Sequence, residues 1–223
     1  TGQIYAVNTE DREVKRITSG PHAKLDVSWS PDGKNLLYVE ERVIEERNSA
    51  DVVVTSIDGT FIKKITYSPG YESKPTWSPD GTAIAFLYRE AGFLAYSELW
   101  IMDSNGKNRR KVTDLQISLN TIAWSPDGEE ILFVSHDDCG KLFRVQIDGS
   151  NLRHIANYPG CIENPAWSPD GAYIMFIGSE SKTSLASSPS WKIYLMTVDG
   201  SSISPLTGIG GRPIIFLWDN STK

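Results

Sequence analysis

Histidine, cysteine and carboxylate side chains are the first candidates for chemistry in this chain, which has 3 histidines and 2 cysteines among 223 residues. The strand pattern described below places His22 and His136 in different loops and His154 on an outer strand. A zinc site needs three or four such ligands together. The run HDDC at 136–139 has suitable residue types, but we favour a solvated turn there over a metal site. We therefore predict no metal and no cofactor.

Common catalytic sequence motifs do not occur in the chain. It has no HExxH, GxSxG or GxxxxGK[ST] sequence, which would place a metal, a nucleophile or a phosphate cradle. The GIGG at 208–211 lacks the GxGxxG spacing of a dinucleotide-binding turn. We therefore expect a protein that is not an enzyme.

One twelve-residue phrase occurs four times, as VSWSPDGKNLLY, PTWSPDGTAIAF, IAWSPDGEEILF and PAWSPDGAYIMF. Its tryptophans lie 48, 47 and 43 residues apart, at Trp29, Trp77, Trp124 and Trp167. A period of this length is typical of propeller blades with four strands each. The strands become less apolar from first to last within each repeat, as expected for a blade that runs from the axis of a ring to its rim.

The recurring pattern WSPDG…IxF…IY…DG…IT resembles the repeats of TolB-like β-propellers, which are similar in shape to WD-repeat propellers. The likeness covers residues 1 to about 207. It implies an all-β fold, a β-propeller built from four-stranded antiparallel blades. For this family it also implies protein partners and a periplasmic or otherwise extracytoplasmic location.

Counting strands predicts five blades in a single domain over residues 1–223. Third and fourth strands occur five times, but the first and second strands occur together four times, so residues 1–18 need 208–223 to complete their blade. The remaining repeats are 19–66, 67–113, 114–156 and 157–207. The alternative is a fragment of a larger, six-bladed propeller with an open ring. We expect a monomer if the ring closes, and association through exposed strand edges if it does not.

The charge and hydropathy of the chain argue against nucleic-acid binding and against membrane insertion. The net charge is −6 and the pI about 5.1, which argues against binding the phosphates of nucleic acid. Basic pairs such as Lys63-Lys64 fall on outer strands, where charge protects sheet edges. No apolar run approaches the roughly 20 residues that span a bilayer. We expect no nucleic-acid partner and no membrane insertion.

The two cysteines occupy neighbouring loops. Cys139 follows the second strand of one repeat and Cys161 precedes the first strand of the next. These loops emerge on the same face of an up-and-down blade, so the pair is a disulfide candidate. Two separate thiols are the alternative, because the sequence does not supply the Cα separation. A bridge would favour an extracytoplasmic protein.

Loop variability singles out one face of the repeats for binding. Turns at one end are uniform SPDG and DG types, whereas loops at the other end differ in every repeat. Variable loops on a rigid scaffold concentrate binding residues, and aromatic side chains serve as anchors. The candidate binding residues are Asp26, Tyr71, Glu72, Lys74, Asn120, Tyr158, Glu163, Asn164 and Trp191. Simple solvation of loop ends is the alternative for each.

These observations together predict a non-catalytic scaffold whose variable face binds a protein or peptide. Two other functions stay open. One is the propeller part of a larger enzyme, similar to the gating propeller of prolyl oligopeptidase relatives. The other is a glycan-active propeller, as in lyases with related repeats, which requires convergent histidines or carboxylates.

Overall fold

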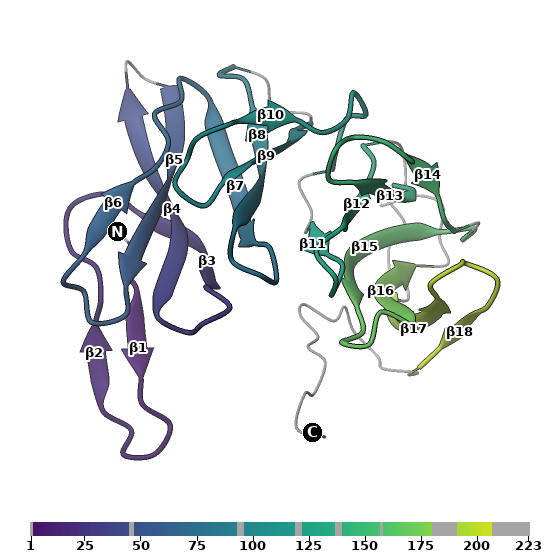
Figure 1. Ribbon diagram of the computed structural model, residues 1–223, viewed down its shortest axis with the longest axis horizontal. Coiled ribbons are helices and arrows are strands. Elements are labelled where there is room, and N and C mark those ends of the chain that lie inside the picture. Colours follow the sequence, from purple (N-terminus) through teal and green to yellow (C-terminus); the bar gives the residue numbers. More distant parts are fainter. Residues whose placement is uncertain are drawn as a thin grey trace. The chain divides into compact units, whose positions relative to one another are not determined.

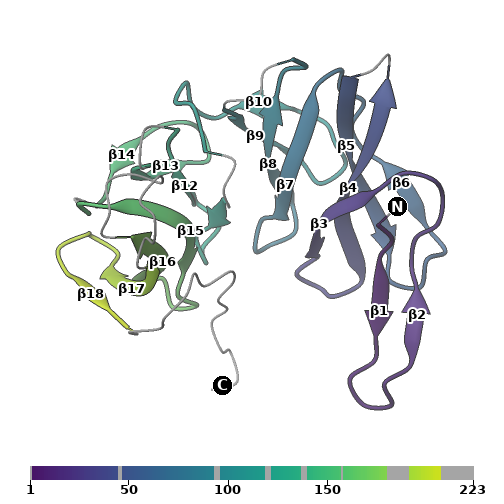
Figure 2. The same cartoon turned by 180° about the vertical axis from the view of Figure 1, so that it is seen from behind.

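The computed structural model describes residues 2–44, 47–92, 96–118, 122–136, 140–156, 158–179 and 191–206. Strands, turns and irregular segments make up this part of the chain, and it contains no helix that could cross a membrane. The chain divides into two compact units, Thr1–Lys111 and Val112–Lys223. Figures 1 and 2 show the strands of both units.

The first unit begins with a hairpin of β1 (Tyr5–Val7) and β2 (Val14–Arg16), which extends beyond the other strands of this unit in both views (Figures 1 and 2). The second sheet contains β3 (Lys24–Trp29), β4 (Asn35–Ile44), β5 (Arg47–Ser56), β6 (Ile62–Lys64), β7 (Tyr71–Trp77), β8 (Ala83–Arg89), β9 (Glu98–Asp103) and β10 (Arg110–Lys111). Its pairs are antiparallel except for β5 and β7, where Ala50 lies opposite Tyr71. That parallel contact joins the repeats β3–β6 and β7–β10.

The second unit contains two four-stranded antiparallel sheets, in sequence order. One consists of β11 (Ala123–Trp124), β12 (Glu130–Val134), β13 (Leu142–Gln146) and β14 (Arg153–His154). The other consists of β15 (Cys161–Trp167), β16 (Tyr173–Ser179), β17 (Trp191–Thr197) and β18 (Ile203–Pro205). These sheets confirm the predicted all-β class with four-stranded antiparallel units.

The second and third strands of the four repeats share one register. The opposed pairs are Leu36 and Thr55, Ile84 and Met102, Ile131 and Val145, and Ile174 and Met196. Two positions further along the second strand, an aromatic side chain is at most 1% exposed in each repeat: Tyr38, Phe86, Phe133 and Phe176. Strands that are apolar on both faces are expected to lie in the middle of stacked layers, and these strands form the core.

The SPDG turns are closed by their own side chains. In the first, the Ser30 hydroxyl donates to Asp32 Oδ1 over 2.6 Å, and the same oxygen accepts the Lys34 N–H. Gly33 has φ +70°, a conformation that glycine adopts without steric cost. These hydrogen bonds lower the pKa of Asp32, as charge-stabilising donors do.

The β1–β2 hairpin has no second strand beside it among the described residues. Val7 is 58% exposed, whereas the residues at its position in the other repeats, Thr55, Met102, Val145 and Met196, are at most 1% exposed. Residues 208–223, which the sequence predicts to complete this blade, lie outside the described residues. Closure of the ring and the count of five blades therefore stay predictions.

Candidate functional site

A β-bulge recurs in the first strand of three repeats. The strands β3, β7 and β15 each shift register against their neighbour three residues before the motif tryptophan. The bulged residues Asp26, Lys74 and Asn164 have φ of +52°, +52° and +47°. Non-glycine residues in this conformation are strained and concentrate at functional sites. The matching residue of the third repeat, Thr121, lies outside the described part.

Two of these bulged residues, both in the first unit, form an ion pair. Lys74 Nζ lies 2.6 Å from Asp26 Oδ1, and the Lys74 backbone N–H donates to Asp26 Oδ2 over 3.0 Å. The two side chains are 40% and 20% exposed. The Asp26 carboxylate thus holds the bulge of β7, the first strand of the next repeat, and leaves the pair accessible to a partner.

Tyr71 lies at the start of β7, three residues from this ion pair. Its hydroxyl donates to Glu41 Oε1 over 3.3 Å, and the Arg89 guanidinium carbon lies 4.9 Å from its ring centroid. Burial, and then the nearby Glu41 carboxylate, raise the pKa of Tyr71 to about 12. The phenol is therefore protonated at neutral pH and acts as a hydrogen-bond donor.

A small pocket of about 100 Å³ adjoins this group. It is lined by Tyr88, Arg89, Glu90, Tyr96 and Glu98. Arg89 thus contributes both to the pocket and to the Tyr71 contact. We call Asp26, Glu41, Tyr71, Lys74 and Arg89 the loop-end cluster, and all five side chains are partly exposed.

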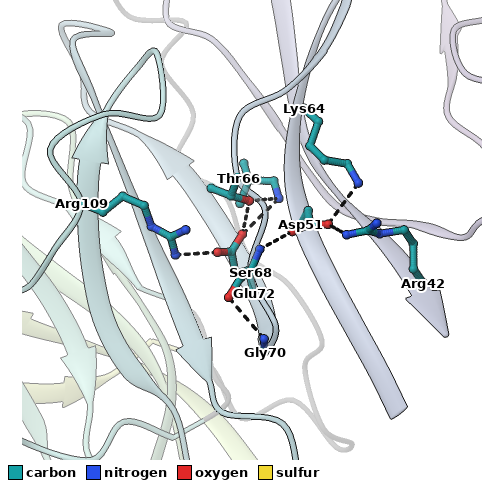
Figure 3. Close-up of polar contacts among 9 residues, drawn as sticks. Arg42, Asp51, Lys64, Thr66, Ser68, Gly70, Glu72 and Arg109 are labelled. Carbon is teal, nitrogen blue, oxygen red and sulfur yellow. Dashed lines mark hydrogen bonds and ion pairs between the residues drawn. The ribbon is translucent and has the colours of Figure 1, made fainter. Parts of the chain in front are cut away.

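Glu72 points into the fold, where it is 0% exposed (Figure 3). Its Oε1 accepts a hydrogen bond from Arg109 Nη2 over 2.6 Å, and its Oε2 accepts the Thr66 hydroxyl and, over 3.2 Å, the Val52 N–H. Burial raises the pKa of Glu72 against the lowering effects of Thr66 and Arg109. We leave this residue out of the loop-end cluster because its oxygens serve partners within the unit.

Asp51 is a second fully buried carboxylate in the same region (Figure 3). Its Oδ2 pairs with Arg42 and with Lys64 Nζ, the latter over 3.1 Å, and its Oδ1 accepts the Ser68 N–H over 2.8 Å. Buried charges need such partners to be tolerated. Asp51 and Glu72 thus secure the junction between the repeats β3–β6 and β7–β10.

The candidates in the second unit are placed differently. Trp191 is 7% exposed and packs with Cys161 and Ile177. Tyr158 packs edge-on against Phe176 with ring centroids 5.3 Å apart. Both aromatic rings therefore belong to the packing of this unit. Glu163 and Asn164 are partly exposed, and Asn120 lies outside the described residues.

The cysteine and metal predictions involve residues that the structure describes in part. No free cysteine occurs in the described segments, where Cys161 is 7% exposed. Cys139 lies outside them, so the disulfide stays a prediction. Within the same segments no group of three His, Cys, Asp or Glu side chains could hold a metal ion. His136 and His154 are exposed and His22 is partly exposed.

Three features of the site escaped the reasoning from sequence. Glu41 and Arg89 belong to the cluster but come from the second strands of their repeats. The bulge contains no glycine that would have indicated it in the sequence. Asp26 and Asn164 were a weak signal, because Asp and Asn tolerate positive φ better than other residues. The shared position of Asp26, Lys74 and Asn164 could have been found by aligning the repeats.

No protein-family model matches the chain. It is similar to the uncharacterized peptidase YuxL of Bacillus subtilis strain 168, with 28% identity over 111 residues, which is 48% of this chain and 16% of that protein. TolB from Acinetobacter baumannii is similar with a TM-score of 0.69 and 18% identity, over 92% of this chain and 48% of the TolB chain. The fold is a TolB-like β-propeller.

A third similarity shows how little the fold says about activity. An oligogalacturonate lyase in complex with manganese has a TM-score of 0.72 and 14% identity, over 91% of this chain and 58% of the lyase chain. This chain thus spans less than two thirds of each of these three proteins. Similar propellers thus occur both in TolB and in a lyase, and function must be argued from the site.

Proposed function

We propose that this protein is a non-catalytic binding scaffold that holds a protein or peptide at the loop-end cluster of its first unit. The observation that carries the proposal is the concentration of an ion pair, a tyrosine and an arginine at one end of the sheet, all partly exposed. The TolB-like fold supports a protein partner and an extracytoplasmic location.

The chemistry of the cluster suits recognition. Arg89 lies against the Tyr71 ring, and a stacked guanidinium keeps N–H groups for carboxylate or backbone carbonyl acceptors of a partner. Tyrosine and arginine are the residue types that most often dominate binding energy. The raised pKa of Tyr71 opposes formation of a phenolate nucleophile, which suits a hydrogen-bonding role for this residue.

Affinity capture followed by measurement with the purified partner tests this proposal. The variant removes Tyr71 and Arg89 together, as Tyr71→Ala with Arg89→Ala. The matched control, Tyr173→Ala with Lys63→Ala, also removes one tyrosine and one cation, both exposed and outside the cluster. Extracts of the cell envelope and the cytosol are compared.

The expected partner is retained by the intact chain and by the control. Loss of a hot spot worth about 2 kcal/mol or more corresponds to roughly 30-fold weaker binding by the cluster variant. Equal retention of every captured protein by the cluster variant and the control would refute the proposed site. Enrichment from the envelope extract alone would support the extracytoplasmic location.

A second candidate function is the propeller part of a larger hydrolase. The similarity to peptidase YuxL favours it, because the matched 111 residues are 16% of that protein. A peptidase domain with a Ser-His-Asp catalytic triad, encoded in the same reading frame, would support this function. A reading frame that holds no such domain would remove it.

A further inference from the structure

A cleft of about 650 Å³ lies in the second unit, between the hairpin of β13 and β14 and the turn from β17 to β18. Small-molecule sites commonly measure roughly 300–1,000 Å³. Side chains on its walls include Arg144, Arg153, His154, Asp199 and Ser201. All residues on its walls belong to the second unit, whereas the loop-end cluster belongs to the first.

Close backbone packing holds one wall of the cleft. Gly200, in the turn between β17 and β18, has φ +75°, and a Cβ on it would lie 1.8 Å from the Ile155 carbonyl oxygen. Only glycine satisfies both conditions. The turn therefore rests directly on the residue that follows β14, which fixes this wall of the cleft.

Arg144 breaks the pattern of the repeats. It occupies the third-strand position that lies opposite Leu132 in its own sheet. The residues that the same register places at this position in the other four-stranded repeats are Val54, Ile101 and Leu195. An apolar residue therefore satisfies the fold at this position, and the arginine needs another explanation.

The arginine is also poorly satisfied where it lies. Its side chain is 13% exposed, and its hydrogen bond from Nη1 to Glu130 Oε2 is long, at 3.3 Å. Its Nε is buried without a hydrogen-bond acceptor among the described residues. Burial lowers the pKa of the guanidinium, which again marks an unfavourable environment for the charge. Arg144 thus costs stability that an aliphatic residue would not.

The surrounding charges leave donors available to a ligand. Arg153 is 52% exposed, and its Nη2 lies 3.0 Å from Oε1 of Glu130, the carboxylate that also pairs with Arg144. Asp199 accepts hydrogen bonds from the hydroxyls of Thr197 and Ser201. Two guanidinium groups thus share one carboxylate, while the second carboxylate has donors of its own. The charged side chains on the cleft walls are two arginines and one aspartate, a net formal charge of +1, which suits a ligand with a single negative charge better than a polyanion.

We propose that this cleft binds a small molecule that carries one carboxylate, held by the guanidinium groups of Arg144 and Arg153. Planar carboxylates match the geometry of guanidinium donors. A carboxylate between the two arginines would add acceptors for their Nη groups, which otherwise share the Glu130 carboxylate. The charged position in β13 is then explained by ligand binding.

A pair of nearly isosteric probes tests the charge requirement. N-acetylglycine carries the carboxylate, and N-acetylglycinamide carries a neutral amide in its place. Both are titrated into the intact chain while ¹H–¹⁵N resonances are followed. Arg144→Leu restores the aliphatic type found at Leu195, Arg153→Gln removes the more exposed donor, and Lys63→Leu is the control for loss of one positive charge outside the cleft.

Saturable shifts with N-acetylglycine and none with the amide are expected. Arg144→Leu should weaken binding by about tenfold or more, the value of one charge-assisted hydrogen bond, and Arg153→Gln should weaken it as well. Lys63→Leu should bind as the intact chain does. Equal binding of the amide, or unchanged binding by both arginine variants, would overturn the proposal.

Thermal unfolding without ligand separates this role from a structural one. If Arg144 serves ligand binding, Arg144→Leu unfolds at the same temperature as the intact chain or higher, because an unsatisfied buried donor is removed. A lower unfolding temperature together with no saturable binding to the intact chain would show that Arg144 serves only to neutralise Glu130.

Discussion

Arg109→Met leaves the buried carboxylate of Glu72 without its cation and tests the junction between the repeats of the first unit. Glu72 is 0% exposed and Arg109 Nη2 lies 2.6 Å from its Oε1. Methionine keeps an apolar chain near Phe86 and Trp100, whose ring centroids lie 5.1 and 5.9 Å from the Arg109 guanidinium carbon. The substitution therefore removes charge and donors more than packing.

The size of the loss follows from burial. Removing one partner of a buried ion pair costs about 3–5 kcal/mol. The Arg109 side chain is 28% exposed, so solvent screens part of the interaction and we expect the lower end, about 3 kcal/mol at a pH near 8. With a urea dependence of about 2 kcal/mol per M, the unfolding midpoint should fall by about 1.5 M.

The loss should depend on pH. Burial raises the pKa of Glu72, and removal of Arg109 raises it further because the cation lowers it. The folded state then holds the proton more tightly than the unfolded state, so the free energy of unfolding falls as pH rises from the unfolded pKa of about 4.3 through the folded pKa. Below that window both states are protonated and the loss should nearly vanish.

Urea unfolding at pH values near 4 and 8 measures both effects. Glu72→Met with Arg109→Met is the matched variant, because removing both partners leaves no unpaired charge and should restore most of the stability. The Val52 N–H retains the Thr66 hydroxyl as acceptor, over 2.8 Å. A loss for Arg109→Met of less than about 1 kcal/mol, or one that does not shrink at low pH, would refute the reasoning.

Three further predictions concern the turns, the cysteines and the ring. Hydrogen bonds from Ser56 and then Thr60 lower the pKa of Asp58 to about 2, so the stabilising effect of its charge is present above the unfolded pKa of about 3.9 and is lost as pH falls through the folded value. Asp58→Ala should therefore lower the melting temperature near pH 7 and have little effect near pH 2. An equal shift at both pH values would contradict this. Peptide mapping of unreduced protein should recover a peptide pair joined through Cys139 and Cys161, and alkylation of both thiols without reductant would rule the bridge out. If residues 208–223 complete the first blade, then Val7→Asp should destabilise the chain about as much as deletion of 208–223, because burying an unpaired charge is costly; unchanged stability of Val7→Asp would argue for an open edge.

The fold was predictable from the sequence because its signals are local and repeated. Asp-Gly turns, alternation along strands and the motif tryptophan recur in four repeats, so an error in one is corrected by the others. The predicted second strands are the buried core strands, with Phe86, Phe133 and Phe176 at 0% exposure. The second and third strands pair in the same register in all four repeats, which confirms that these repeats share one strand arrangement.

The candidate site was predictable only in part. Asp26, Tyr71 and Lys74 do come together in the first unit, but Glu72, next to Tyr71 in sequence, points into the fold. Strand alternation explains that opposition, because successive side chains point to opposite faces. The bulge then resets the alternation before Trp77, so the faces cannot be followed from the tryptophan back to Tyr71.

The sequence by itself determined the strand order, the turn chemistry and the class of fold, since these depend on residues close together in the chain. Only the tertiary structure decided which polar side chains are available for binding. Glu72 is buried because Arg109 and Thr66 surround it, and Arg144 lines a cleft because the turn at Gly200 packs beside it. Exposure and pKa depend on neighbours from distant parts of the chain, which a repeat pattern does not specify.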